Sequence, residues 1–256
     1  MTLMRAEVLK LFGRRLYLVM VVILAVLVAI TAFFLLVLVQ ISPDLADEGV
    51  PLITKPDAYI IGVQQVVSQT WFPLILAVIV LGGELASTVW ATGLTRESSK
   101  VRHVTARIVV LTAASWLAMA LGIGGWSLVT ALAAEGAGSP SITDWLSVAW
   151  KVGAIQLAWT SLGIGFVAML RAVGPAIGAA IAISFGEGLL SLWDTYEQVS
   201  LTVGSSAIFG DFDLGGFFGD LMPGAGVSVI HSTIIVLGWT MLGLLLTWWG
   251  LQRRDA

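Results

Sequence analysis

The residues of this chain that could do chemistry are few, so each kind of catalytic site can be compared with the sequence directly. A phosphate-binding loop ends in Gly-Lys-Ser/Thr, and none of the four lysines follows a glycine. The two histidines, His103 and His231, do not form a His-Glu-x-x-His motif, and cysteine is absent, which disfavours a zinc site. A Gly-x-Ser-x-Gly turn with a nucleophilic serine is missing too. We therefore expect no catalytic site, metal or cofactor on this chain.

Glu187 is the one acid inside a long apolar stretch, in ISFGEGLL. A central acid costs about 2.5–3.5 kcal/mol to insert into a bilayer, so its carboxylate should face protein or a water-filled cavity. Helical geometry places it about 9 Å inside Trp193, and His231 lies at a comparable depth in the last apolar stretch. The two could form a buried hydrogen-bonded pair or part of a substrate or proton path. Alternatively, Glu187 reaches the nearby interface and has only a structural role.

The elements that must position these residues are expected to be membrane-spanning helices. Hydrophobic residues make up 58% of the 256 positions and charged residues 11%, which indicates lipid as the solvent. A span needs about 20 apolar helical residues, and the alternation typical of a membrane β-barrel is absent. We predict an all-α, single-domain polytopic membrane protein covering residues 1–256. Its six spans are expected at about 16–39, 59–81, 108–133, 146–170, 175–193 and 227–251.

The charges orient these spans. With both termini cytoplasmic, eleven of the thirteen basic residues fall inside, and only Lys55 and Lys151 are counted outside. The acids between the spans fall mainly on the outer side. Because the positive-inside rule depends on Lys and Arg, we predict cytoplasmic termini. The scattered charges form no basic stripe with interleaved aromatics, so nucleic acid is not an expected partner.

Three further segments have distinctive patterns. Residues 2–15 mix apolar and basic positions, as in an amphipathic helix lying in the headgroup region; a plain basic anchor is the alternative. Residues 194–226 form a long, Gly-rich, semi-apolar outer loop, which favours short helices packed on the outer face, with a compact loop as the alternative. Small residues recur at every fourth position in the fifth span, a row that permits close helix packing within the bundle or between subunits. The row comprises Gly174, Gly178, Ala182 and Gly186.

The segment between the second and third spans, 81–107, carries the largest polar cluster on the basic side. Glu84 suits a helix N-terminus, and Ser98 or Ser99 can cap the helix that leads through Arg107 into the third span. The pattern predicts a short cytoplasmic helix, a turn and a basic return to the membrane. A mere anchoring loop would be shorter.

This segment resembles the membrane subunits of type-2 ATP-binding-cassette (ABC) transporters, especially the small six-span bacterial permeases. Their pattern after the second span is Glu, then Gly-Thr, Leu-Leu-Ser/Thr-Arg-Pro-x-Ser-Arg, and a later Lys. Glu84, 94–96 (Leu-Thr-Arg), 99–100 (Ser-Lys) and 106–107 (Ala-Arg) stand at the matching positions. The sequence departs from the pattern where Thr-Val replaces Gly-Thr at 88–89, where glycine replaces the first Leu at 93, and where glutamate replaces Pro at 97.

The resemblance implies the permease subunit of a bacterial inner-membrane exporter, embedded in lipid and dimeric with a second copy or a paralogous permease. A separate ATPase subunit would bind ATP and Mg and would contact the short cytoplasmic helix, which acts as a coupling helix. The residues expected at that contact are Glu84, Thr95, Arg96, Ser99 and Lys100. The segment 194–226 would form the outer gate.

Two other functions remain open from the sequence. A secondary transporter could use Glu187 and His231 as a proton relay, and would transport without nucleotide. A membrane scaffold or sensor with a permease-like fold would bind its partner without substrate-dependent ATP hydrolysis.

Overall fold

The computed structural model describes residues 3–45, 55–85, 99–133, 139–190, 193–209 and 227–253, and the regular structure of these residues is entirely helical. The expected all-α class is therefore confirmed for this part of the chain. The helices are α1 (Leu3–Phe12), α2 (Arg15–Leu45), α3 (Lys55–Val67), α4 (Trp71–Leu85), α6 (Lys100–Ala133), α7 (Ile142–Leu170), α8 (Val173–Leu190), α9 (Asp194–Glu197), α10 (Leu201–Ala207) and α12 (Val229–Gln252).

Five stretches within these helices are long and apolar enough to cross a membrane. They are Arg15–Phe34, Ala58–Glu84, Val101–Leu132, Ile142–Leu170 and Val229–Gln252. The apolar part of α8, Val173–Glu187, is shorter. The membrane character of the chain is thus supported. The expected fifth span, 175–193, and with it the total of six, remains a prediction that depends on α8.

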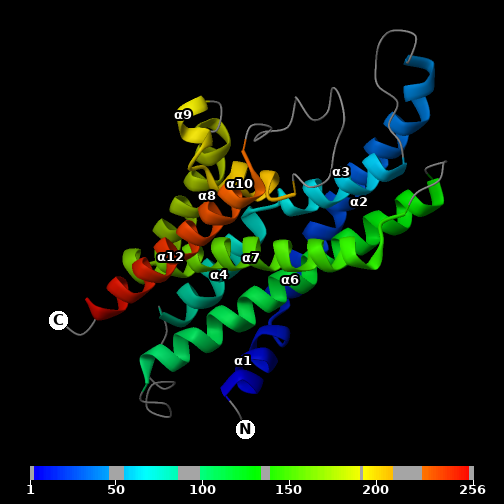
Figure 1. Cartoon of the computed structure of the whole chain (residues 1–256). Helices are drawn as coiled ribbons and strands as arrows, with labels where there is room; N and C mark the ends of the chain where they lie inside the picture. Colours follow the sequence, from blue (N-terminus) through cyan, green and yellow to red (C-terminus); the bar gives the residue numbers. More distant parts are fainter. Residues whose placement is uncertain are drawn as a thin grey trace.

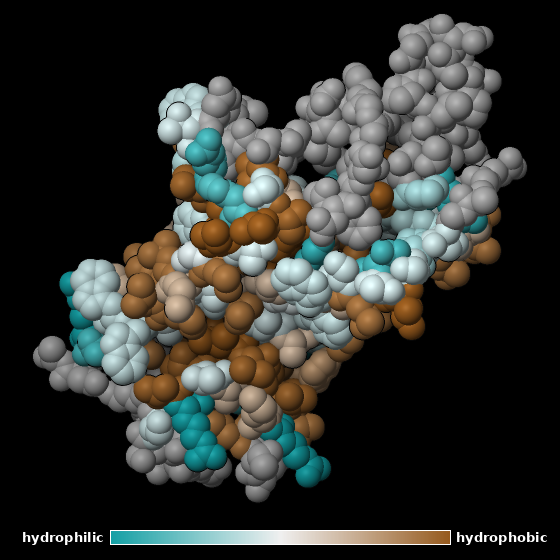
Figure 2. Space-filling model, viewed as in Figure 1, coloured by the Kyte–Doolittle hydropathy of each residue, from teal (hydrophilic) through white to brown (hydrophobic). Residues whose placement is uncertain are grey.

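The outer surface of the helices is hydrocarbon over wide areas. Large side chains such as Phe34, Leu128 and Ile230 are 66%, 62% and 76% exposed, and brown, hydrophobic residues cover much of the visible face (Figure 2). Contiguous apolar surface of this extent is not stable in water. These faces suit contact with lipid tails.

The second expected span is two helices rather than one. Residues 68–70 separate α3 from α4, and the cause of this break is Pro73. Pro73 has no N–H for the carbonyl of Gln69, and its ring would clash with that carbonyl in a continuous helix. The expected span over 59–81 is thus present as the candidate span Ala58–Glu84, interrupted at residues 68–70, and Pro73 is the signal in the sequence for the interruption.

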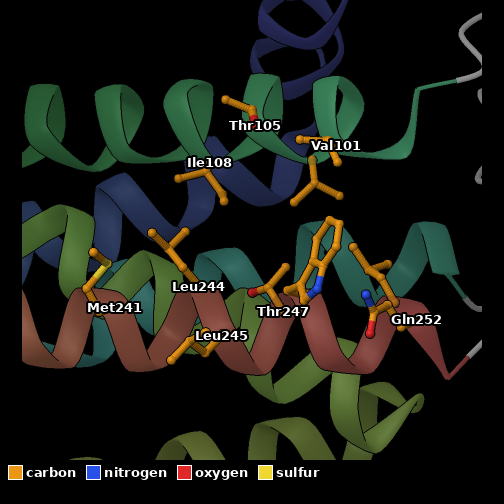
Figure 3. A pocket seen from close by; sticks show the side chains of 11 residues that line it. Val101, Thr105, Ile108, Met241, Leu244, Leu245, Thr247 and Gln252 are labelled. Carbon is orange, nitrogen blue, oxygen red and sulfur yellow. The ribbon is translucent and has the colours of Figure 1, made fainter.

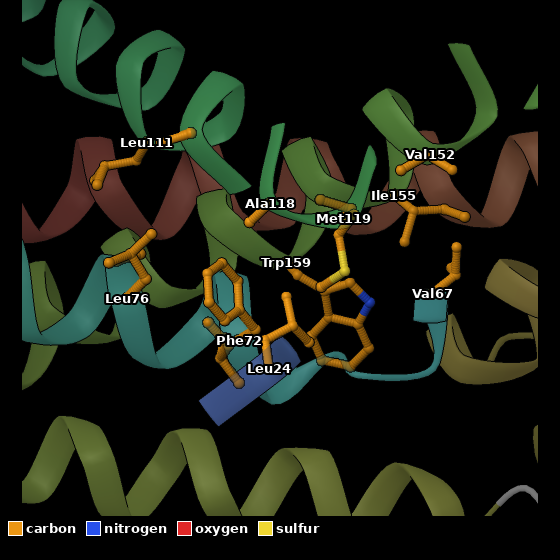
Figure 4. Packing of buried hydrophobic residues seen from close by; sticks show 14 of the residues in the cluster. Leu24, Val67, Phe72, Leu76, Leu111, Ala118, Met119, Val152, Ile155 and Trp159 are labelled. Carbon is orange, nitrogen blue, oxygen red and sulfur yellow. The ribbon is translucent and has the colours of Figure 1, made fainter. Parts of the chain in front are cut away.

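The helix α7 is the centre of the bundle, since it contacts α4, α6, α8 and α12. Its Trp159 is fully buried, with Phe72, Leu24 and Met119 around the indole (Figure 4). A large aromatic side chain at such a position fixes the spacing of several helices at once. The helices α2, α4 and α6, which carry these three neighbours, therefore pack against α7 at one shared point.

Close backbone contact fastens α12 to α7. A Cβ placed on Gly243 would lie 2.6 Å from the carbonyl carbon of Ser161, and one on Gly250 would lie 2.5 Å from that of Ala168. Only glycine permits this approach, which is how helices associate in lipid without a hydrophobic driving force. The pair α7 and α12 is the tightest contact between long helices in the described part of the chain.

The two ends of the bundle differ in content. One end, called here the terminal end, holds α1, the last residues of α4, the first of α6, and the last of α7 and α12. The opposite end, called the far end, holds α9 and α10 (Figure 1). Each end contains a buried polar cluster.

Candidate functional site

At the terminal end, Glu84 lies in the last turn of α4 with its side chain only 2% exposed. Its carboxylate receives the guanidinium of Arg14 at 2.8 Å and forms close ion pairs with Lys10 and Arg107. Arg14 also donates to the carbonyl of Val80 at 3.4 Å. Three cations, from α1, α6 and the link between α1 and α2, thus converge on one buried carboxylate.

A second acid extends this network. Glu7 of α1 lies 3.6 Å from Arg107 Nε, 3.9 Å from His103 Nε2 and 4.0 Å from Lys10 Nζ. Arg107 Nη2 is 3.0 Å from His103 Nε2, so that nitrogen acts as the acceptor in this arrangement. These six residues are called here the Glu84 cluster: Glu7, Lys10, Arg14, Glu84, His103 and Arg107.

The Glu84 cluster joins α1, α4 and α6 at both ends of the segment 86–98. Removing one partner of a buried ion pair costs about 3–5 kcal/mol, because it leaves the other charge uncompensated. A displacement of the segment must therefore move these three helices together or break the cluster. The spacing in the sequence is consistent with this cluster. Glu7 and Lys10 share one face of α1, and His103 and Arg107 share one face of α6, while Arg14 lies in the link that follows α1.

The residues expected at an ATPase contact have different positions. Thr95 and Arg96 lie outside the described residues. Ser99 is exposed and caps α6, accepting from the N–H of Arg102 at 3.3 Å, and Lys100 is the first residue of that helix. Glu84, by contrast, is turned into the bundle, so in this conformation its carboxylate binds residues of its own chain.

At the far end, the buried carboxylate of Glu187 on α8 accepts three hydrogen bonds. The donors are Tyr196 Oη at 2.5 Å, Ser200 Oγ at 2.7 Å and the N–H of Thr202 at 3.1 Å. Burial, and then the bond to the Glu187 carboxylate and its charge, raise the pKa of the Tyr196 phenol. The phenol therefore stays protonated and remains a donor. This group is called here the Glu187 cluster.

His231 binds the same segment from another helix. Its Nε2 donates to the carbonyl of Gln198 at 2.7 Å, and Trp239 Nε1 donates to that of Val199 at 2.7 Å. Glu187 and His231 therefore hold neighbouring residues of one segment instead of each other. Tyr196 and Ser200, which the sequence reading missed, supply the partners of the acid.

Lys151, which the charge count assigns to the outer side of the membrane, is buried inside the bundle. It lies within α7, fully buried, with Nζ 5.8 Å from the centre of the Phe209 ring. A buried lysine in a spanning helix marks a functional position by default. The signal was its place inside an apolar stretch, five residues into the expected fourth span.

The small-residue row on α8 faces away from the bundle. A Cβ on Gly174, Gly178 or Gly186 would meet nothing within 4 Å, and Ala182 is exposed. The row therefore makes no close helix contact within the described part of the chain. The second expectation for it, an interface between subunits, remains a prediction.

A groove of about 610 Å³ lies between α6 and α12 at the terminal end (Figure 3). Its walls are mostly apolar, with polar atoms from Thr105, Thr247, Gln252 and the indole N–H of Trp248, and the Thr247 hydroxyl is bonded to the carbonyl of Gly243. The groove is of ligand size, and its chemistry suits acyl chains.

The comparisons with known proteins add no relative. The sequence matches no protein-family model and no curated protein. Within the described ranges, no three His, Cys, Asp or Glu side chains gather where they could hold a metal ion. What the chain does must therefore be argued from its sequence pattern and from the two clusters.

Proposed function

We propose that this chain is the membrane subunit of an ABC exporter and that a separate ATPase subunit acts on it through the segment 84–107. The observation that carries the proposal is the Glu84 cluster. It stands where the permease-like sequence pattern begins and ends, and it ties that segment to α1 and α6. If a partner subunit displaces this segment, the displacement reaches the spanning helices only through a rigid connection such as the Glu84 cluster, because a flexible loop would not transmit it.

In this proposal α8 is the fifth of six spans, both termini are cytoplasmic, and the chain lies in the bacterial inner membrane. The exposed row on α8 supports pairing with a second copy or a paralogous permease, since small residues allow close helix approach in lipid. ATP and Mg belong to the partner. The segment at the far end, which the Glu187 cluster holds, is the outer gate.

The residues given to the ATPase contact divide into two roles. Thr95, Arg96, Ser99 and Lys100 are the contact itself, on the sequence pattern. Glu84 transmits the motion, since its carboxylate already binds residues of α1 and α6. The proton-relay alternative gains no support from the far end, where Glu187 and His231 bond separate groups.

The test is co-purification from the native membrane. The tagged chain should bring down a subunit that carries a phosphate-binding loop and hydrolyses ATP. Arg96→Glu combined with Lys100→Glu should lower the recovery of that subunit at least about tenfold, the effect of losing roughly 1.4 kcal/mol of binding. The matched control is Arg5→Glu with Arg15→Glu, which reverses two exposed charges of α1 and α2 and should leave recovery unchanged. Transport by the purified chain alone, driven by a proton gradient, would refute the proposal.

A further inference from the structure

The short helix α10 lies inside the far end of the bundle rather than on its surface. Leu201, Val203, Ile208 and Phe209 are all fully buried, and α10 contacts α12, α3 and α8. In Figure 1 it lies between α12 and α3. A seven-residue helix makes too few internal hydrogen bonds to be stable alone, so its neighbours hold it in place.

The beginning of α10 is held by a negative charge. Glu187 accepts from Ser200, the N-cap residue, and from the N–H of Thr202 in the first turn. The first N–H groups of a helix have no intrahelical acceptor, and this end of a helix favours an anion. The buried carboxylate therefore has both a geometric and an electrostatic reason to bind there.

The end of α10 is near a positive charge. Phe209 follows the last turn, and the Lys151 ammonium lies 5.8 Å from the centre of its ring, within the range of a cation–π contact. Lys151 belongs to α7 and Glu187 to α8, so charges of opposite sign on two different helices lie near the two ends of α10.

We propose that Glu187 and Lys151 clamp α10 as a plug across the far end of the bundle. Withdrawing the plug removes two donors, Ser200 Oγ and the N–H of Thr202, from the buried Glu187 carboxylate, and moves the Phe209 ring away from the Lys151 ammonium. The carboxylate then needs water in place of these donors, so the plug leaves when the far end hydrates and stays when it is dry. The clamp deepens the proposed function and rests on it, since closing the far end matters only if cargo passes there.

The chain contains no cysteine, so a single introduced thiol reports access to the plug without background. Ser205 of α10 is 4% exposed and Cys is nearly isosteric with it. The chain carrying Ser205→Cys is reconstituted alone in liposomes and treated with a membrane-impermeant maleimide. A second chain carries Ser115→Cys instead, in the fully buried core of α6. The quantity measured is the ratio of the Ser205→Cys to the Ser115→Cys labelling rate in one background.

Adding Glu187→Gln or Lys151→Met to both cysteine variants should raise this labelling ratio at least about tenfold above its value in the same variants without the added change. A tenfold rise corresponds to a loss of roughly 1.4 kcal/mol from the free energy that keeps the plug in place. Lys55→Met, which removes an exposed lysine of α3 that bonds the carbonyl of Ala131, is the matched control and should leave it unchanged. An unchanged ratio overturns the clamp, including the case in which both labelling rates rise together because the bundle has loosened. An equal rise with Lys55→Met overturns it too.

This experiment uses neither nucleotide nor a partner. A raised ratio with no ATPase in the co-purification would keep the clamp and reject the ABC assignment. An unchanged ratio with an ATPase present would do the reverse.

Discussion

Glu84→Gln is the change to which the Glu84 cluster should be most sensitive. The substitution keeps the shape of the side chain and removes its charge. Arg107, 3% exposed, then loses its buried counter-ion. Lys10 and Arg14 lose the same partner, but their side chains are 30% and 29% exposed and can turn to water.

The expected cost is therefore dominated by one pair. Breaking the pair with Arg107 costs about 3–5 kcal/mol when one partner is removed, and the two half-exposed cations add about 0–1 kcal/mol each. Gln retains one acceptor oxygen and Glu7 lies 3.6 Å from Arg107 Nε, which moves the estimate to the lower end, about 3 kcal/mol. Glu7→Gln, whose contacts are all 3.6 Å or longer, should cost only about 1 kcal/mol.

The assay is reversible unfolding in mixed micelles of increasing SDS content, followed by the fluorescence of the eleven tryptophans. In a double-mutant cycle, Glu84→Gln and Arg107→Gln together should cost less than the sum of the single changes by up to about 3 kcal/mol. If Glu84→Gln is no less stable than Glu7→Gln, or if the two changes simply add, the carboxylate is not the centre of the cluster.

Two other predictions use the same unfolding assay. Gly243→Ala should destabilise the protein by about 1–3 kcal/mol, since its methyl group would overlap the backbone of Ser161. The control is Gly238→Ala on the same helix, whose methyl group meets no atom and which should gain up to about 1 kcal/mol of helix propensity. Equal effects of the two changes would contradict the close packing of α7 and α12. Tyr196→Phe should destabilise the protein by about 1 kcal/mol below pH 10. This difference should shrink as the pH rises above 10, the ordinary pKa of a phenol, because the pKa of Tyr196 is raised in the folded state and high pH therefore favours the unfolded chain. A difference that does not change with pH would contradict the hydrogen bond to Glu187.

The helical class and most helix positions could be predicted from the sequence because apolar length alone decides them. The break at 68–70 was also readable, since Pro73 excludes a continuous helix. Which helices pack against each other could not be predicted from apolar length or from proline. Glu84 and Arg107 are both visible as polar residues of one segment, but only the fold shows that they meet each other, with α1 beside them, rather than a partner protein.

The far end shows the same limit. Counting charges by side of the membrane does not show whether the side chain of Lys151 is exposed or buried. Its neighbour Phe209 lies far along the sequence and has no pattern that points to a lysine. Glu187 was found because an acid within an apolar stretch is costly, but its partners follow it in a loop whose path the sequence does not specify.

The two clusters lie at opposite ends of one rigid connection. The helix α4 carries Glu84 in its last turn and packs along its length against α7 and α8, the helices that carry Lys151 and Glu187. Its Phe72, Leu74 and Leu76 are fully buried, and a close-packed interior transmits displacement instead of absorbing it. The two ends nevertheless respond differently. Among the described residues, Glu84 pairs with three cations, whereas Glu187 accepts from three neutral donors, two of which, Ser200 and Thr202, belong to the plug. Glu84 can therefore lose one cation and keep two, while Glu187 loses two of its three donors in one step if the plug leaves.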